Sequence, residues 1–458
     1  MKNTSHLLDL IRRSLAGPLV DEEDFNLKRV SQGVYRVVRE YEIRANPAAI
    51  VNQDDELADR VWQAALDFLA ACGVYCQDTR RVILYSREEI EARLREAPSQ
   101  VWLGEGTDAC LEVARKVEDA RVPLNMGSPI GSPVAEELFV PLMQSYIQEP
   151  GVDVTCAASL MTVFGQEVRT GSPLEVLAAW HEADLMRLAL HKAGRPGMAW
   201  TGLTMSMSDV GQLSAAGPAG LRPGDMHTFG LISELKTNFA ILNKLAHAIR
   251  LGGIIDPYAN PIYGGLGGGV EGQAVLIAAA MIALSAFFMA AMVGSSPTHP
   301  FNFNDTGPEV MRAASLAFQA LARNSHLMTN LTVTPVGGPG TRTLLYECLA
   351  FTVMSTVSGI SRILGPRSAT GSIPGHFSGL EARFNGEVLQ AAAGMERGQA
   401  EQIVQRALSK YADQLDKKPY GMPFQEVYDL DTVQPKAGWL ALVEEVKKEA
   451  IGWGLPLA

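Results

Sequence analysis

The most distinctive candidate site in the sequence is the run GMAWTG, residues 197–202, which follows a Gly-Arg-Pro turn after a long helical segment. An apolar run that ends in a hydroxyl and a glycine is typical of a buried strand that opens onto a loop. The run offers Trp200 and Thr201 but no acid, base or thiol. An aromatic ring and a hydroxyl can bind and orient a ligand, but they supply no strong nucleophile.

Aromatic side chains also fall at the ends of other predicted strands. Tyr258 and Tyr263 occupy such positions, and Phe229 begins a following segment. Gathered with Trp200 on one face, these rings would form a cage that attracts a cation through cation–π interactions. Ordinary core packing is the alternative interpretation of the same residues.

Five carboxylates near predicted strand ends are further candidates. An acidic side chain in such a position can serve acid–base chemistry, but it can equally cap a turn or a helix. These carboxylates are Glu105, Asp108, Asp225, Asp256 and Asp305.

Other catalytic patterns are weak. The eight His residues do not cluster and no HxH or HExxH motif occurs, so we predict no metal site. The Gly-Ser-Pro runs at 131–133 and 171–173 are better explained as helix starts, with each serine as an N-cap, than as nucleophiles. The match to G-x-G-x-x-G at 267–272 lies in a glycine-rich stretch and lacks the acidic residue of a dinucleotide site. We interpret it as a loop whose backbone approaches a neighbour closely.

Composition excludes several classes of protein. The chain of 458 residues has a net charge of −11 and no basic stripe, which argues against a nucleic-acid partner. Its five scattered cysteines are expected for a cytoplasmic protein without disulfides. The apolar stretch 274–293 has the length of a membrane span, but it is rich in alanine and stands alone. We therefore predict no membrane segment, and a helix packed on all sides at a subunit or domain contact.

Short β-rich runs separated by helical segments predict the fold. Such an alternation indicates parallel strands joined by crossover helices, and Gly, Ser, Thr and Pro gather after the runs, as in a closed (β/α)8 TIM barrel. We expect an N-terminal helical cap at 1–97, the barrel at 98–400, and a C-terminal helical extension of the same domain at 401–458. The stretch 227–252 is expected to be one helix. The predicted strands begin near 101, 122, 152, 197, 261, 299 and 330.

Seven segments resemble, in the same order, the monomethylamine:corrinoid protein methyltransferase family, from about residue 20 to the end of the chain. The resemblance implies a TIM barrel and a homo-oligomer that is hexameric in known members. It also implies transfer of a methyl group from an amine to the Co(I) centre of a separate corrinoid protein. The segments are CGVYCQDTRRV (72–82), GSPVAEELFVPLMQSY (131–146), GSPLEVLAA (171–179), AGRPGM (193–198), PIYGGLGGGVE (261–271), GLEARFNGEVLQAAAGME (379–396) and FQEVYDLDTVQP (424–435).

At the residues that the resemblance places in the active site, the chain departs from the family. Thr201 stands where the family has pyrrolysine, and two glutamates of the family fall on Thr228 and Tyr258. A glutamine of the family falls on Thr332 and a nearby tyrosine on Thr334. Hydroxyls and a ring thus replace acidic groups suited to a small ammonium, which indicates a larger or differently charged methyl donor.

These observations predict a corrinoid-dependent methyltransferase that works without pyrrolysine and binds no cofactor tightly, because the corrinoid arrives on its partner protein. Co(I) attacks a methyl carbon in line and the departing nitrogen must be cationic, so the expected donor is a small quaternary or N-methylated amine. A methyl ether or thioether donor and a non-catalytic ligand-binding barrel are the alternatives. We expect Thr201 to be catalytic, Trp200, Thr228, Phe229, Tyr258, Tyr263, Thr332 and Thr334 to bind substrate, and Gly264, Gly265, Gly267 and Gly268 to face the corrinoid.

Overall fold

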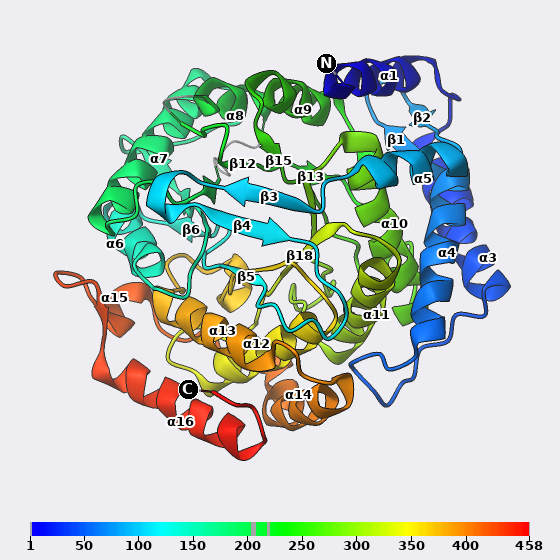
Figure 1. Cartoon of the computed structure of the whole chain (residues 1–458). Coiled ribbons are helices and arrows are strands. Elements are labelled where there is room, and N and C mark those ends of the chain that lie inside the picture. Colours follow the sequence, from blue (N-terminus) through cyan, green and yellow to red (C-terminus); the bar gives the residue numbers. More distant parts are fainter. Residues whose placement is uncertain (1, 203–207, 218–219, 458) are drawn as a thin grey trace.

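A ring of parallel strands surrounded by helices forms the centre of the molecule (Figure 1). The computed structural model describes residues 2–202, 208–217 and 220–457. The ring strands in chain order are β5 (Leu124–Met126), β7 (Thr155–Cys156), β11 (Trp200–Thr201), β12 (Met226–His227) with β13 (Gly230–Leu231), β15 (Ile254–Ile255) with β16 (Tyr258–Ala259), β17 (Met292–Ser295), β18 (Met328–Thr332) and β19 (Arg362–Leu364).

The ring closes because its last strand pairs with its first. β19 lies parallel to β18 on one side and to β5 on the other, with Leu364 opposite Met126. β5 meets β7 through a parallel bridge between Met126 and Val154, β7 pairs with β11, and β12 pairs with β15. β11 and β12 are neighbours. The structure therefore forms the (β/α)8 barrel that the sequence predicted.

A helix follows each strand position and covers the outside of the ring. Side-chain caps define where several of these helices begin: Asn238 accepts a hydrogen bond from the Ile241 N–H at 2.9 Å, and Thr341 accepts one from the Leu344 N–H at 3.3 Å. The helices are α6 (Glu136–Ile147), α7 (Pro173–Lys192), α8 (Asp209–Ala215), α9 (Phe239–Leu251), α10 (Val270–Phe288), α11 (Pro308–Asn324), α12 (Arg342–Val357) and α13 (Gly379–Ala392).

An antiparallel hairpin, β3 (Gln100–Leu103) and β4 (Cys110–Val113), lies across one end of the barrel (Figure 1). Glu112 of β4 points into the barrel and pairs with Arg362, the first residue of β19, at 3.1 Å. The hairpin therefore covers the amino ends of the strands. Behind it the barrel is filled by a core of Met, Leu, Val and Ala side chains, which leaves only the carboxyl ends open to a ligand.

Several predicted strand positions are wrong. The runs at 261 and 299 lie in loops after β16 and β17, and the run at 101 belongs to the hairpin. The stretch 227–252 is helical only from Phe239, and the sequence does not predict β19. Ring strands of two to five residues are too short to show a hydrophobic period. The apolar stretch 274–293 contains both the end of α10 and the start of β17, and its uniform composition conceals the boundary.

The apolar helix α10 is packed on all sides, as predicted. Every residue from Gly272 to Phe288 is buried, and its neighbours are α4, α5 and α11 of the same chain. Among the described helices it is the one that could cross a membrane by length and composition, but its window of highest hydropathy is 89% buried in the protein. A helix buried on all sides in this way is a core helix, and α10 lies at the contact between the N-terminal segment and the barrel.

The N-terminal segment packs along one side of the barrel and the C-terminal segment along an adjoining side, and the two meet where Glu401 accepts from the Val51 N–H (Figure 1). One hydrophobic core extends from Leu7 to Leu457, so the boundaries predicted at 97 and 400 divide parts that fold together and stay a prediction. The N-terminal elements are α1 (Lys2–Ala16), α2 (Glu22–Asp24), α3 (Gln32–Glu40), α4 (Asp55–Cys72), β1 (Val74–Cys76), β2 (Arg81–Ile83) and α5 (Arg87–Glu96). The C-terminal elements are α14 (Arg397–Tyr411), α15 (Phe424–Val427), β20 (Tyr428–Asp429), β21 (Gln434–Pro435) and α16 (Ala437–Gly452).

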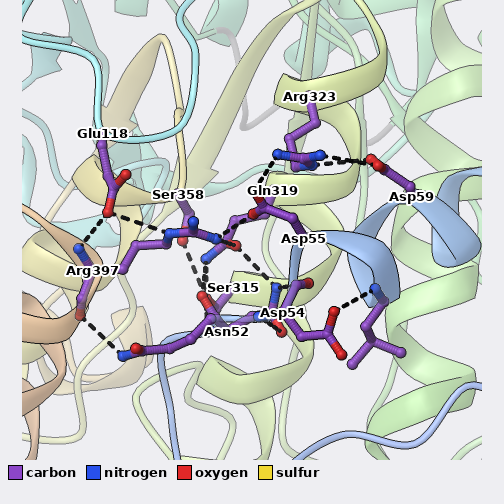
Figure 2. Close-up of polar contacts among 12 residues, drawn as sticks. Asn52, Asp54, Asp55, Asp59, Glu118, Ser315, Gln319, Arg323, Ser358 and Arg397 are labelled. Carbon is purple, nitrogen blue, oxygen red and sulfur yellow. Dashed lines mark hydrogen bonds and ion pairs between the residues drawn. The ribbon is translucent and has the colours of Figure 1, made fainter.

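A polar network near the hairpin end joins these three parts of the chain (Figure 2). The Arg397 guanidinium, at the start of α14, contacts Asp55 of α4 at 2.7 Å and Gln319 of α11 at 3.1 Å. It also pairs with Glu118, in the connection before β5, at 3.3 Å. Arg323 of α11 reaches the same Asp55 at 2.7 Å. The network lies at the amino-terminal face of the barrel, far from the carboxyl ends of the strands. In TIM barrels, contacts at the amino-terminal face serve stability rather than catalysis.

We expect Arg397→Met to lower the free energy of unfolding by about 1–2 kcal/mol, because three partners lose a mostly buried donor while two of the acids stay partly hydrated. Urea denaturation followed by circular dichroism measures this change. Arg406→Met on the same helix is the matched control, since among the described residues its guanidinium donates only to the Trp453 carbonyl at 3.3 Å. Equal losses in the two variants would show that the network adds nothing.

Candidate functional site

A cavity of about 390 Å³ opens at the carboxyl ends of the ring strands, opposite the hairpin. TIM barrels hold their active sites at this end, because the loops that follow the strands meet there. Polar groups without charge make up much of the lining, and they come from separate strands and loops. They are Thr201, Gln212, Thr228, Asn260, Ser296 and Thr332.

Two threonines from neighbouring strands form a hydroxyl pair in this cavity. Thr201 ends β11, and its hydroxyl donates to the hydroxyl of Thr228, just after β12, at 2.7 Å. The Gln212 amide donates to the Thr228 carbonyl at 2.8 Å and fixes that loop. Because side chains alternate along a strand, Thr201 faces the barrel interior while Trp200 faces the helix layer. Trp200 is 1% exposed within the outer core, and it is not among the described residues that line the cavity.

The floor of the cavity is a buried charge network. The Arg362 guanidinium contacts Asp256 at 2.6 Å, Glu112 at 3.1 Å and the Tyr258 hydroxyl at 3.2 Å. Asn330 donates to the other oxygen of Asp256 at 3.2 Å. Burial raises the pKa of Glu112 to about 7 although Arg362 opposes the shift. Tyr258 links this network to the cavity, because its ring lines the cavity while its hydroxyl touches the buried charges.

Gly294 of β17 makes room for the Tyr258 ring. A side chain at this position would place its Cβ 2.0 Å from the ring, closer than any real contact. The neighbouring strand therefore needs a glycine here because the ring occupies the space of a side chain, and the ring is held in place against the strand.

Two cationic side chains also line the cavity, Lys244 from α9 and Arg367 from the loop after β19. No carboxylate or imidazole is among the described residues of the lining. Its thiol, Cys156, has its pKa raised to about 12 by burial and is neutral at physiological pH. The lining thus presents positive charge and hydroxyls, and the sequence analysis singled out neither cation. Arg367 follows a strand that was not recognised, and Lys244 lies within a helix where nothing in the sequence marks it.

The structure brings some of the other predicted residues to the cavity and not others. Phe229 and Thr332 line it. Thr334 lies beyond the end of β18, 3% exposed, where its backbone N–H donates to Asp305 at 2.7 Å. Tyr263 stacks on His299, with ring centroids 6.0 Å apart, and is not among the described lining residues. Two of the four rings of the expected cage, those of Phe229 and Tyr258, are therefore in position.

The glycine-rich loop after β16 lies beside a different hollow. Gly265, Gly267 and Gly268 line it together with Tyr35 of α3. The Gly264 N–H donates to the Gly268 carbonyl at 2.9 Å, which closes the loop on itself. The loop is on the carboxyl side of the barrel, and its expected contact with a corrinoid stays a prediction.

The five candidate carboxylates serve structure. Glu105 and Asp225 both pair with Arg222. Asp108 accepts from the Gly197 N–H at 2.9 Å, so it holds the turn before β11. Asp305 accepts from Thr334, and Asp256 belongs to the buried network. None of the five is among the described residues that line the cavity.

A closed barrel with a ligand-sized, mixed polar and aromatic cavity at the carboxyl ends of its strands defines the class of TIM-barrel enzymes. Within this class the chain belongs to the monomethylamine methyltransferase MtmB family, whose model matches residues 6–455. The protein is therefore a methyltransferase.

Known relatives agree over the whole chain. The sequence is 30% identical over 454 residues to monomethylamine methyltransferase MtmB2 of Methanosarcina acetivorans, with 99% of both chains covered. It is 30% identical over 447 residues to MtmB of Methanosarcina mazei, with 98% of this chain and 97% of the relative covered. The crystal structure of the Methanosarcina barkeri enzyme matches with a TM-score of 0.95 at 29% identity, covering 98% of each chain. A crystal structure of the hydroxylamine MtmB complex matches equally well.

The buried network leads to a pH-dependent prediction for Glu112→Gln. A glutamate whose pKa is about 7 in the folded protein and near 4.5 in the unfolded chain favours folding below pH 4.5, and this stability is lost as the pH rises to 7. Glutamine stays neutral, so the variant should match the wild type near pH 4.5 and exceed it at pH 8 by up to about 3 kcal/mol. Urea denaturation at both pH values measures the difference. Glu167→Gln, on an exposed hairpin, is the control and should show no such divergence.

Proposed function

We propose that the protein transfers a methyl group from an N-methylated amine, preferably a quaternary one, to the Co(I) centre of a separate corrinoid protein, and that it does so without pyrrolysine. Membership of the MtmB family supports methyl transfer. The resemblance places Thr201 at the pyrrolysine position, and Thr201 has the hydroxyl of Thr228 within 2.7 Å. A hydroxyl pair can orient a donor but cannot form a covalent adduct with it.

The observation that carries the proposal is the absence of an attacking group from the described part of the lining. Cys156 is held as the neutral thiol, and the other side chains are hydroxyls, amides, rings and cations. The cavity therefore fits a nucleophile that enters from outside the chain. The corrinoid would supply that nucleophile when its protein meets the mouth of the barrel.

The same lining favours a quaternary nitrogen as the leaving group. The C–N bond must break with its electron pair on nitrogen, and a quaternary ammonium then departs as a neutral tertiary amine without needing a proton. The rings of Tyr258 and Phe229 can hold such a cation while the Thr201–Thr228 pair aligns it. An ether or thioether would need an acid or a metal at its leaving atom. Among the described residues no group of three His, Cys, Asp or Glu side chains is arranged to bind a metal ion.

We expect the purified protein, mixed with chemically reduced cob(I)alamin and a panel of N-methylated amines, to form methylcobalamin with at least one quaternary member. The change in visible absorbance measures the reaction. Monomethylamine should be the poorer donor, because the lining has two cations and no carboxylate to receive a small ammonium. No methylcobalamin from any member would contradict the proposal and favour a non-catalytic ligand-binding barrel.

The role of the Tyr258 ring can be separated from that of its hydroxyl. Tyr258→Leu should weaken binding of the active donor by about 1–2 kcal/mol, because it removes the aromatic face. Tyr258→Phe keeps the face and loses only the contacts with Arg362 and Asp256, so it should bind almost as tightly as the wild type. Isothermal titration without corrinoid gives both affinities. Equal weakening in the two variants would assign the effect to the buried network instead of the ring.

A further inference from the structure

Two cations that face the cavity have no partner in the described part of the protein. Lys244 and Arg367 both line the cavity, and neither head group makes a hydrogen bond or an ion pair with a described residue. The Nε of Arg367 is buried without a hydrogen-bond acceptor. Its side chain packs over Gly371, where a Cβ would come within 2.1 Å of this nitrogen, so the loop is shaped around the guanidinium.

The acids nearest to these cations are engaged elsewhere. Asp209 accepts from the Asn243 amide at 2.6 Å, and Glu175 accepts from the Ser208 N–H at 3.1 Å. Asp305 accepts from the Thr334 N–H at 2.7 Å. Burial lowers the pKa of Lys244 more than Asp209 and Glu175 raise it, and burial lowers the pKa of Arg367 more than Asp305 raises it. The sequence has no acidic residue at 203–207 or 218–219.

A cationic group that is partly withdrawn from water without a partner is unfavourable for the folded protein, and the Lys244 and Arg367 side chains are both half-buried. The buried Arg362 has Asp256 and Glu112 as partners, and the buried Arg115 donates to four backbone carbonyls. Lys244 and Arg367 have neither kind of partner among the described residues, and the cavity of about 390 Å³ on which they border has space for an anion that would supply one. Arginine and lysine together are a common arrangement for binding a carboxylate.

We infer that the methyl donor carries a carboxylate, which Lys244 and Arg367 bind while its N-methylated cationic end lies toward Tyr258 and Phe229. This inference rests on the proposed function and specifies its substrate class: a zwitterionic N-methylated amino acid. In one cavity the carboxylate of such a donor would meet the two cations, and its quaternary ammonium would meet the aromatic rings. Methyl transfer leaves the carboxylate unchanged and turns the quaternary ammonium into a tertiary amine.

The test compares probes that differ in one charge. The first set is a series of trimethylammonio-carboxylates with one to three methylene groups between nitrogen and carboxylate. Choline keeps the cation and lacks the carboxylate, whereas 3,3-dimethylbutanoate keeps the carboxylate and replaces nitrogen by carbon. Isothermal titration of the whole protein without corrinoid should show at least one member of the series binding tenfold or more tightly than either choline or 3,3-dimethylbutanoate.

Variants of the two cations locate the carboxylate. Lys244→Met and Arg367→Met should each weaken the best zwitterion at least tenfold and leave choline unchanged. The midpoint temperatures of unfolding of the two variants should not fall, because each substitution removes a charge that has no partner among the described residues. If a methionine variant does not fold, Lys244→Gln or Arg367→Gln takes its place. Lys448→Met, which removes an exposed charge of α16, is the control for a general charge effect.

Three results would each overturn the inference. Choline could bind as tightly as every zwitterion, no zwitterion could bind, or the affinity for the best zwitterion could be unchanged in both variants. Methyl transfer from donors without a carboxylate, equally fast in both variants, would also overturn it while leaving the proposed function intact. Conversely, carboxylate binding through both cations without methylcobalamin formation would support the anion site and contradict the proposed function.

Discussion

The Arg362 guanidinium, fully buried inside the barrel, sets the constraint on which the interior depends. A charge in this position needs a compensating acid, because the loss of Asp256, its closer partner, would leave an uncompensated ion in a medium of low polarity, whereas Glu112 has a pKa raised by burial and is the weaker partner. Glu112 comes from the hairpin and Asp256 from the connection between β15 and β16. One side chain therefore fixes the hairpin across the amino end of the barrel and the strand that carries Tyr258 into the cavity.

This network also determines the electrostatics of the open end. Asp256 lies directly below the cavity, yet its charge is matched by Arg362 and its second oxygen is held by Asn330. The cavity above is left with hydroxyls, rings and two cations, although the chain as a whole has a net charge of −11. Within the barrel the acids Glu112 and Asp256 thus lie beneath the cavity, paired with Arg362, whereas the described lining carries the positive charge. A cleft with walls of low polarity concentrates the electric field of the charges that line it. Positive charges in the lining therefore favour the entry of ligands with an anionic part.

The alternation of short β-rich runs with helical segments predicted the barrel, and the barrel in turn predicts where part of its cavity lies. Residues at the carboxyl ends of parallel strands must meet, which favours one site for Thr201 and Tyr258, and the family resemblance assigned both residues to that site. Trp200 was expected in the same site, but a strand of two residues shows no alternation that tells its inner face from its outer one, and the structure places the ring against the helix layer. Lys244 and Arg367 escaped notice because one comes from a covering helix and the other follows a strand that the sequence did not reveal. Only the three-dimensional arrangement shows that the two cations have no partner among the residues that the structure describes.

The proposed reaction without a covalent handle changes what the cavity must do. An adduct aligns a methyl group by a bond, whereas non-covalent alignment needs contacts at two separated points of the donor, one near the reacting carbon and one remote from it. In the proposed reaction the rings and the threonine pair would act at the first point. Each charge-assisted hydrogen bond at the second contributes about 1.5–3 kcal/mol, comparable with the cation–π term of about 0.5–2 kcal/mol. Without the remote contact a small cation could rotate in the cavity; with it, the direction from carboxylate to nitrogen defines which methyl group faces the mouth of the barrel.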